Sequence, residues 1–139
     1  MTILTSGQNI YLRQGDTGNL TFQGLPADKK YTAYLSIYNE ETNAISKEFK
    51  SYDYKTNTTG SNGSAVGVAY FKITAELSNS LEVGEWKYGL KVCATDANGL
   101  SEDTVIPRSY KDNEGNIINE EAPTFTVDYK YVEGVVNNG

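Results

Sequence analysis

Hydrophobic and polar residues alternate along much of this chain with a period of two, the spacing of a β-strand that has one buried and one solvated face. The most regular stretch begins at Trp86, and its apolar face carries Trp86, Tyr88, Leu90 and Val92. A tight turn at residues 96–99 and a second alternating run that ends before Pro107 follow it. Strand, turn, strand and proline in this order are typical of a β-sandwich, so we expect Trp86 to lie in the core.

Other alternating runs predict further strands, at residues 10–14, 19–22, 31–38, 44–54, 65–73, 100–106 and 124–136. The core-facing positions expected in these runs are Tyr31, Ala33, Leu35, Ile37, Ile45, Phe49, Phe125, Val127, Tyr129 and Tyr131. The run at 65–73 is apolar on both faces, which indicates a strand that is central in its sheet or covered by another subunit.

The breaks between these runs complete the fold prediction. Residues 55–64, KTNTTGSNGS, have the composition of a flexible loop. Helical spacing occurs at residues 74–81, where Leu77 and Leu81 follow Ile73 at intervals of four and Thr74 is a suitable N-cap. Seven to nine strands with one short helical turn favour an all-β, immunoglobulin-like β-sandwich over a barrel.

The length and composition fit one such domain. A chain of 139 residues with 38% hydrophobic residues can bury a core of its own. We therefore expect a single domain over residues 1–139, with 135–139 as a frayed end or a linker stub.

Charge and hydropathy narrow the range of partners. The formal net charge is −6, whereas a protein that binds duplex nucleic acid needs clustered Lys and Arg. No segment approaches the roughly 20 apolar residues of a membrane span. The first residues lack the basic and apolar regions of a signal peptide, so we expect synthesis in a cytoplasm without dedicated export.

The residue types for most catalytic chemistry are missing. The sequence has no histidine and one cysteine, Cys93, which we expect to be a small packed side chain inside a strand. We find no catalytic triad, metal cage or phosphate loop, and we therefore expect neither an enzyme nor a cofactor.

Acidic residues offer two weaker candidates for a site. Oxygen ligands for calcium occur close together at Asp112, Glu114 and Asn116, and after them at Asp96 and Asn98. These spacings do not match an EF-hand, so a structural turn is the favoured interpretation. Carboxylate pairs for glycoside hydrolysis could come from Glu40, Glu41, Glu102 and Asp103, although the sequence indicates no cleft to hold them.

Tyrosine is the unusual aromatic residue here, with eleven copies against four phenylalanines. Exposed aromatic clusters often mark interfaces, because a rigid ring gives a large contact area at low entropic cost. The candidate interface residues are Tyr34, Tyr38, Tyr52, Tyr54 and Tyr110. Such a platform would serve a neighbouring subunit or a glycan, and a protein partner is favoured.

Four segments together resemble the amino-terminal attachment domains of tailed-phage virion proteins, in the upper-baseplate and fibre-anchor group. They are QGDTGNLTFQGLP at 14–26, YTAYLSIY at 31–38, LEVGEWKYGLKVCATDANGLSEDTVIP at 81–107 and APTFTVDYKYVEG at 122–134. The chain stops at Gly139, soon after VEG, where fibre anchors usually continue into a coiled stalk.

The resemblance implies a non-enzymatic structural protein that attaches to the capsid, tail, baseplate or fibre of a virion made in the bacterial host cytoplasm. Its partners would be other virion proteins, with many copies or a homo-oligomer on a symmetric particle. Neither nucleic acid nor a membrane is expected as a partner. The alternative is a carbohydrate-binding or adhesin-like module, for which a glycan would be the ligand.

Overall fold

The computed structural model describes residues 2–4, 8–60 and 63–129, and these are mostly in strands. The smaller sheet has the order β1-β3-β7-β6, formed by Thr2–Leu4, Gly18–Leu25, Ala65–Ile73 and Asp53–Thr59. The larger sheet has the order β2-β12-β8-β4-β5, formed by Ile10–Arg13, Thr124–Asp128, Gly84–Asp96, Thr32–Tyr38 and Ile45–Lys50. Strand β9 (Gly99–Ile106) also pairs with β8, and β10 (Ser109–Lys111) pairs with β11 (Ile117–Asn119) in a separate hairpin.

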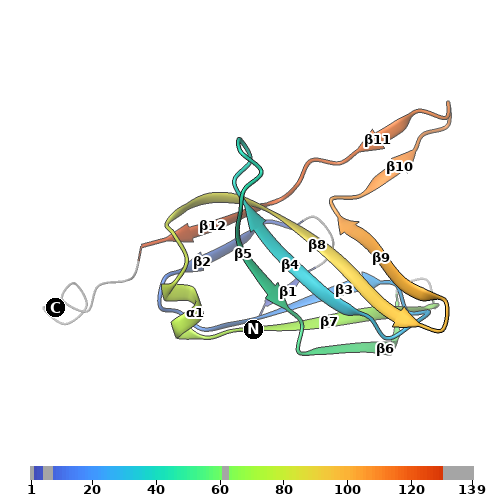
Figure 1. The fold of residues 1–139 in the computed structure, drawn as a ribbon, viewed down its shortest axis with the longest axis horizontal. Coiled ribbons are helices and arrows are strands. Elements are labelled where there is room, and N and C mark those ends of the chain that lie inside the picture. Colours follow the sequence, from blue (N-terminus) through green and yellow to red (C-terminus); the bar gives the residue numbers. More distant parts are fainter. Residues whose placement is uncertain (1, 5–7, 61–62, 130–139) are drawn as a thin grey trace, which may run out of the picture.

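This strand order is that of an immunoglobulin-like sandwich (Figure 1). The smaller sheet follows the A-B-E-D order, and β8, β4 and β5 follow F-C-C′. The position next to β8 that strand G takes in an immunoglobulin domain is shared by two strands. Strand β9 pairs with residues 90–96 of β8, and β12 pairs with residues 84–87. The β10–β11 hairpin is inserted between these two parts. The predicted all-β, immunoglobulin-like fold is therefore confirmed.

The predicted number of strands was too low, since twelve occur in the part of the chain that the structure describes. The inserted hairpin accounts for two of them and β1 for a third. A fourth arises because residues 44–54, predicted as one strand, contain the whole of β5 and the start of β6.

The core lies between the sheets and follows the period-two pattern. The predicted inward residues Tyr31, Ala33, Leu35 and Ile37 are all buried, as are Tyr88, Leu90 and Val92 of β8. Phe22 of β3 bridges the layers, with ring centroids 5.7 Å from Phe71 and 6.1 Å from Tyr88. Each large apolar side chain buried in this way contributes about 1.5–3 kcal/mol to folding.

The change of sheet between β5 and β6 takes place at one peptide bond. Ser51 still belongs to the larger sheet, because its N–H donates to the carbonyl oxygen of Ala33 and its Oγ accepts from the Ala33 N–H, both at 2.9 Å. The next N–H, of Tyr52, donates to Tyr70 of the smaller sheet at 2.9 Å. Alternation continues across this point, which explains why the sequence predicted a single strand.

Ile45 and the 55–64 segment also differ from the predictions. Ile45 is exposed, because the pairing of β4 with β5 shifts its register between Ile37 and Tyr38. Strand β6 continues to Thr59, where a loop was predicted, since it pairs with β7 along this stretch. Beyond it the Gly60 N–H donates to the Ser64 carbonyl oxygen at 2.8 Å, and residues 61–62 lie outside the described part.

Two aromatic residues predicted in the core do not lie there. Trp86 is only partly buried at the end of the sandwich, where its indole N–H donates to the Glu82 carbonyl oxygen at 3.0 Å. Tyr129 is exposed because β12 ends at Asp128. Tyr131 and residues 135–139 lie outside the described residues.

The predicted helical turn is confirmed as α1, Ala75–Asn79, which follows β7. Thr74 caps it as predicted, since its Oγ1 accepts from the Leu77 N–H at 3.1 Å. Leu81 beyond the helix is buried, and its carbonyl oxygen accepts from the Gln14 side chain at 2.7 Å. The helix therefore joins the end of one sheet to the start of β8.

Candidate functional site

The five tyrosines predicted to form one interface lie in four different places. Tyr34 and Tyr38 are on the outer face of the larger sheet, and Tyr52 is beside the outer face of the smaller one. Tyr110 is in the β10–β11 hairpin, and Tyr54 is in the core. The prediction of a single aromatic platform was therefore wrong, although Tyr52 and Tyr110 are exposed and Tyr34 and Tyr38 are partly exposed.

Tyr54 has a structural role. Its side chain is 2% exposed, and its hydroxyl donates to the Pro26 carbonyl oxygen at 2.5 Å. Its ring makes an edge contact with Tyr31 at 5.8 Å, and the Tyr31 hydroxyl donates to Asp28 at 2.9 Å. Burial raises the pKa of Tyr54 well above its ordinary value. Tyr54 thus ties β6 to the segment between β3 and β4, and it is not available to a partner.

The outer face of the larger sheet is hollowed into a groove of about 400 Å³, here called the β4–β8 trough. Ser36 lies in the middle, paired with Gly89 on one side and with Glu48 on the other. The Ser36 hydroxyl donates to Glu48 at 3.1 Å. The trough is also lined by Tyr34, Tyr38, Asn43, Lys91, Thr104 and Pro107.

A second aromatic surface lies on the smaller sheet. The rings of Tyr52 and Tyr70 are 6.3 Å apart, and the Lys55 ammonium is 5.3 Å from the centre of the Tyr70 ring. Tyr52 is 65% exposed. The candidate interface did not include Tyr70, although alternation in β7 places it on the face opposite Phe71.

The β10–β11 hairpin, here called the arm, extends away from both sheets (Figure 1). At its base Arg108 donates two hydrogen bonds to the Glu120 carboxylate, each at 3.0 Å. Ser109 and Asn119 join their side chains at 2.6 Å. Tyr110 and Ile117 are exposed, Ile117 by 67%. The arm therefore presents apolar side chains on a ribbon that is held by polar contacts.

Asp112, a candidate calcium ligand, organises the turn of the arm. Its carboxylate accepts the N–H groups of Glu114 and Asn116, both at 2.9 Å. These hydrogen bonds, foremost the one from Asn116, lower the pKa of Asp112. The structural turn expected here is confirmed.

Asp96, the other acidic candidate, joins two loops. It accepts the Asn98 N–H at 2.8 Å and pairs with Lys29 at 2.9 Å. The contact with Lys29 lowers its pKa. Across the described residues, no three His, Cys, Asp or Glu side chains gather in a group that could hold a metal ion.

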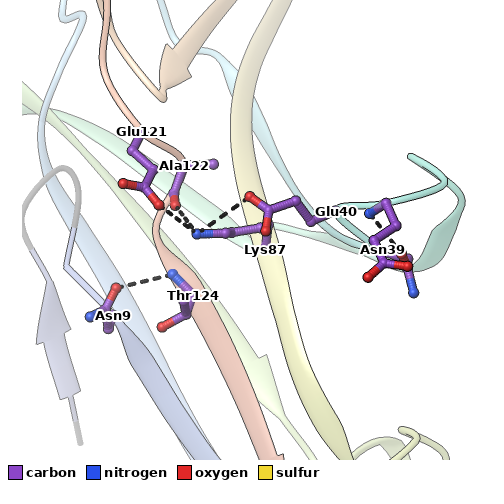
Figure 2. A network of polar contacts seen from close by, with 8 residues as sticks. Asn9, Asn39, Glu40, Lys87, Glu121, Ala122 and Thr124 are labelled. Atoms are coloured by element: carbon purple, nitrogen blue, oxygen red, sulfur yellow. Dashed lines mark hydrogen bonds and ion pairs between the residues drawn. The ribbon is translucent and has the colours of Figure 1, made fainter.

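Two of the four carboxylates considered for hydrolysis, Glu40 and Glu102, take part in ion pairs with lysines. Figure 2 shows Lys87 of β8 between Glu40 at 3.7 Å and Glu121 at 3.1 Å, with the Ala122 carbonyl oxygen accepting at 3.1 Å. Nearby, Asn9 accepts the Thr124 N–H at 3.0 Å. These contacts fix the segment that returns from the arm to β12. The carboxylates around Lys87, chiefly Glu121, also raise the pKa of this lysine.

Glu102 pairs with Lys91 at 3.5 Å, and its carboxylate lies 3.6 Å from the Cys93 sulfur. Burial and then the charge of Glu102 raise the pKa of Cys93. Because the thiolate is the reactive form, this position disfavours nucleophilic chemistry.

No protein-family model matches the chain, and no curated protein is significantly similar to it. Within the described residues, no helix has the length and apolar character needed to cross a membrane.

Proposed function

We propose that this protein is a non-enzymatic structural protein of a tailed-phage particle, and that it attaches to other virion proteins through the arm. Many copies on a symmetric particle would bind multivalently, because contacts that are weak individually add to a stable attachment. The particle component that it binds is the capsid, tail, baseplate or fibre.

The arm is the observation that carries the attachment role. An isolated two-stranded ribbon is at best marginally stable in water, and the exposed apolar side chains on this one offer a partner a surface that would be buried on docking. Here Arg108, Glu120 and Asp112 hold the ribbon in shape, while Tyr110 and Ile117 remain exposed. A preorganised arm of this kind loses little conformational entropy when it docks.

The hollow at the base of the arm supports the same role. It is an open groove of about 700 Å³, where Leu25 and Pro26 face Val105 and Tyr110. Strand β9 borders it and, among the described residues, pairs only with β8, so its other edge can accept a further strand or loop of a partner.

The assignment to a phage particle depends on the resemblance of the four segments described above. The non-enzymatic part is supported by the site chemistry: Glu40 and Glu102 pair with lysines, and burial raises the pKa of the Cys93 thiol.

A pull-down with the purified chain as bait, against the virion proteins encoded in the same genome, tests this proposal. We expect the wild-type chain to retain a virion component and the Ile117→Asp variant to retain much less of it. The matched control is Ile45→Asp, which introduces the same charge at an exposed isoleucine outside the arm. Equal capture by all three chains would refute docking through the arm, and no capture by any of them, with no self-association in light scattering, would refute the attachment role.

A further inference from the structure

The β4–β8 trough exists because small residues meet across two strands. Ser36 of β4 is paired with Gly89 of β8, so the middle of the sheet's outer face carries a hydroxymethyl group beside a position without a side chain. A Cβ on Gly89 would lie 3.3 Å from the Ile106 carbonyl oxygen, a tight contact. The floor of the trough is therefore set by residue size and strand register.

Tyrosine rings stand at both ends of this floor. Tyr34 and Tyr38 lie on the same face of β4, four residues apart, which places their Cα atoms about 13 Å from each other. Both side chains are partly exposed. Their ring faces carry the negative part of the aromatic quadrupole, which attracts the C–H groups of a ligand that stacks on them.

The polar groups of the trough balance in charge. Glu48 accepts from Ser36 at 3.1 Å, and Lys91 is paired with Glu102 at 3.5 Å. Hydroxyl, carboxylate and ammonium groups thus offer both donors and acceptors without a net excess of positive charge. The chain as a whole has a charge of −6, which disfavours an anionic ligand.

From this arrangement we infer that the β4–β8 trough binds a neutral hexopyranose. Such a ring combines a face of C–H groups, which stacks on Tyr34 or Tyr38, with hydroxyl groups that hydrogen-bond to Glu48, Ser36 and Lys91. The volume of about 400 Å³ falls in the range of small-molecule sites. The trough lies on the sheet and not on the arm, so this activity is separate from the proposed attachment.

The test is a titration of the isotope-labelled chain with a panel of methyl hexopyranosides, followed by amide chemical shifts. The sugars are taken to about 50 mM, because one ring in an open trough is expected to bind with a Kd of about 1–10 mM. We expect saturable shifts at Ser36 and Gly89 with at least one member of the panel.

Tyr34→Ala and Tyr38→Ala each remove one wall, and at least one of them is expected to weaken binding by about tenfold. The matched control is Tyr52→Ala, which removes an exposed ring near the other sheet and should leave the Kd unchanged. Absence of saturable shifts across the panel, or an equal loss in the Tyr52→Ala chain, would overturn the inference. Ile117→Asp should bind the sugar as the wild type does, so failure of arm docking and failure of sugar binding are distinguishable.

Discussion

Tyr54 and Gly67 meet where the hydroxyl of Tyr54 donates to the Pro26 carbonyl oxygen. A Cβ on Gly67 would lie 2.5 Å from the Tyr54 oxygen and 2.3 Å from the Pro26 oxygen, closer than real Cβ contacts come. The absence of a side chain at position 67 thus allows β6, β7 and the end of β3 to come together around one buried hydroxyl. Substitutions at Gly67 and at Tyr54 should therefore each lower the stability of the fold.

Gly67→Ala should lower the free energy of unfolding by about 1–3 kcal/mol, because the added methyl group presses on a backbone oxygen that cannot move aside easily. Urea unfolding measures this loss. Gly18→Ala is the control, since a Cβ there would meet nothing within 4 Å. A Gly67→Ala chain as stable as the wild type would show that the close approach is not present in solution.

Tyr54→Phe should lower the free energy of unfolding by about 1–3 kcal/mol, because the Pro26 carbonyl oxygen loses its buried donor while the ring still fills the core. The same urea experiment measures it. Tyr52→Phe serves as the control, because this side chain is exposed and a surface change of this size is expected to stay within about 0.5 kcal/mol. Equal effects from both substitutions would contradict a buried role for Tyr54.

Stability should also fall at alkaline pH. Burial raises the pKa of both Tyr54 and Tyr88 above the ordinary value of 10.0. Below pH 10.0 the folded and the unfolded chain both keep these two phenol protons. Above it the unfolded chain loses them while the folded chain still holds them, so the free energy of unfolding decreases as pH rises.

Urea midpoints between about pH 9 and about pH 11 measure this decrease. The Tyr54→Phe/Tyr88→Phe double variant should show a shallower decline, because it has lost both raised groups. The same slope in the double variant and the wild type would assign the alkaline loss to other residues.

The sequence predicted what depends on local alternation and missed what depends on register. Leu35 and Val92 were placed in the core because a period of two is enough to do so. Tyr52 and Tyr54 are also two apart, yet one is exposed and the other buried, since the chain changes sheets at Ser51 and Tyr52. No local pattern marks that change.

The candidate sites show the same division. Tyr34 and Tyr38 were predicted to point outward, and they do. The trough between them requires Ser36 to pair with Gly89, two residues far apart in the chain, and a single sequence does not specify this register. Tyr110 is exposed as predicted, but the projecting hairpin that carries it was predicted only as a turn.

Lys87→Met should lower the melting temperature, because Glu40, Glu121 and the Ala122 carbonyl oxygen would lose their shared cation. The Lys87 side chain is only 11% exposed, so water replaces the ammonium poorly. Thermal unfolding followed by circular dichroism measures the change. Lys111→Met, in the exposed arm, is the control, and a similar melting temperature for both variants would mean that the network adds no stability.

Hydrogen–deuterium exchange is the most direct test of attachment through the arm. The chain is compared alone and in complex with the virion component that it captures. We expect slower exchange of the amides at residues 109–119 in the complex. Unchanged exchange in the arm, with protection confined to the outer faces of the two sheets, would contradict it.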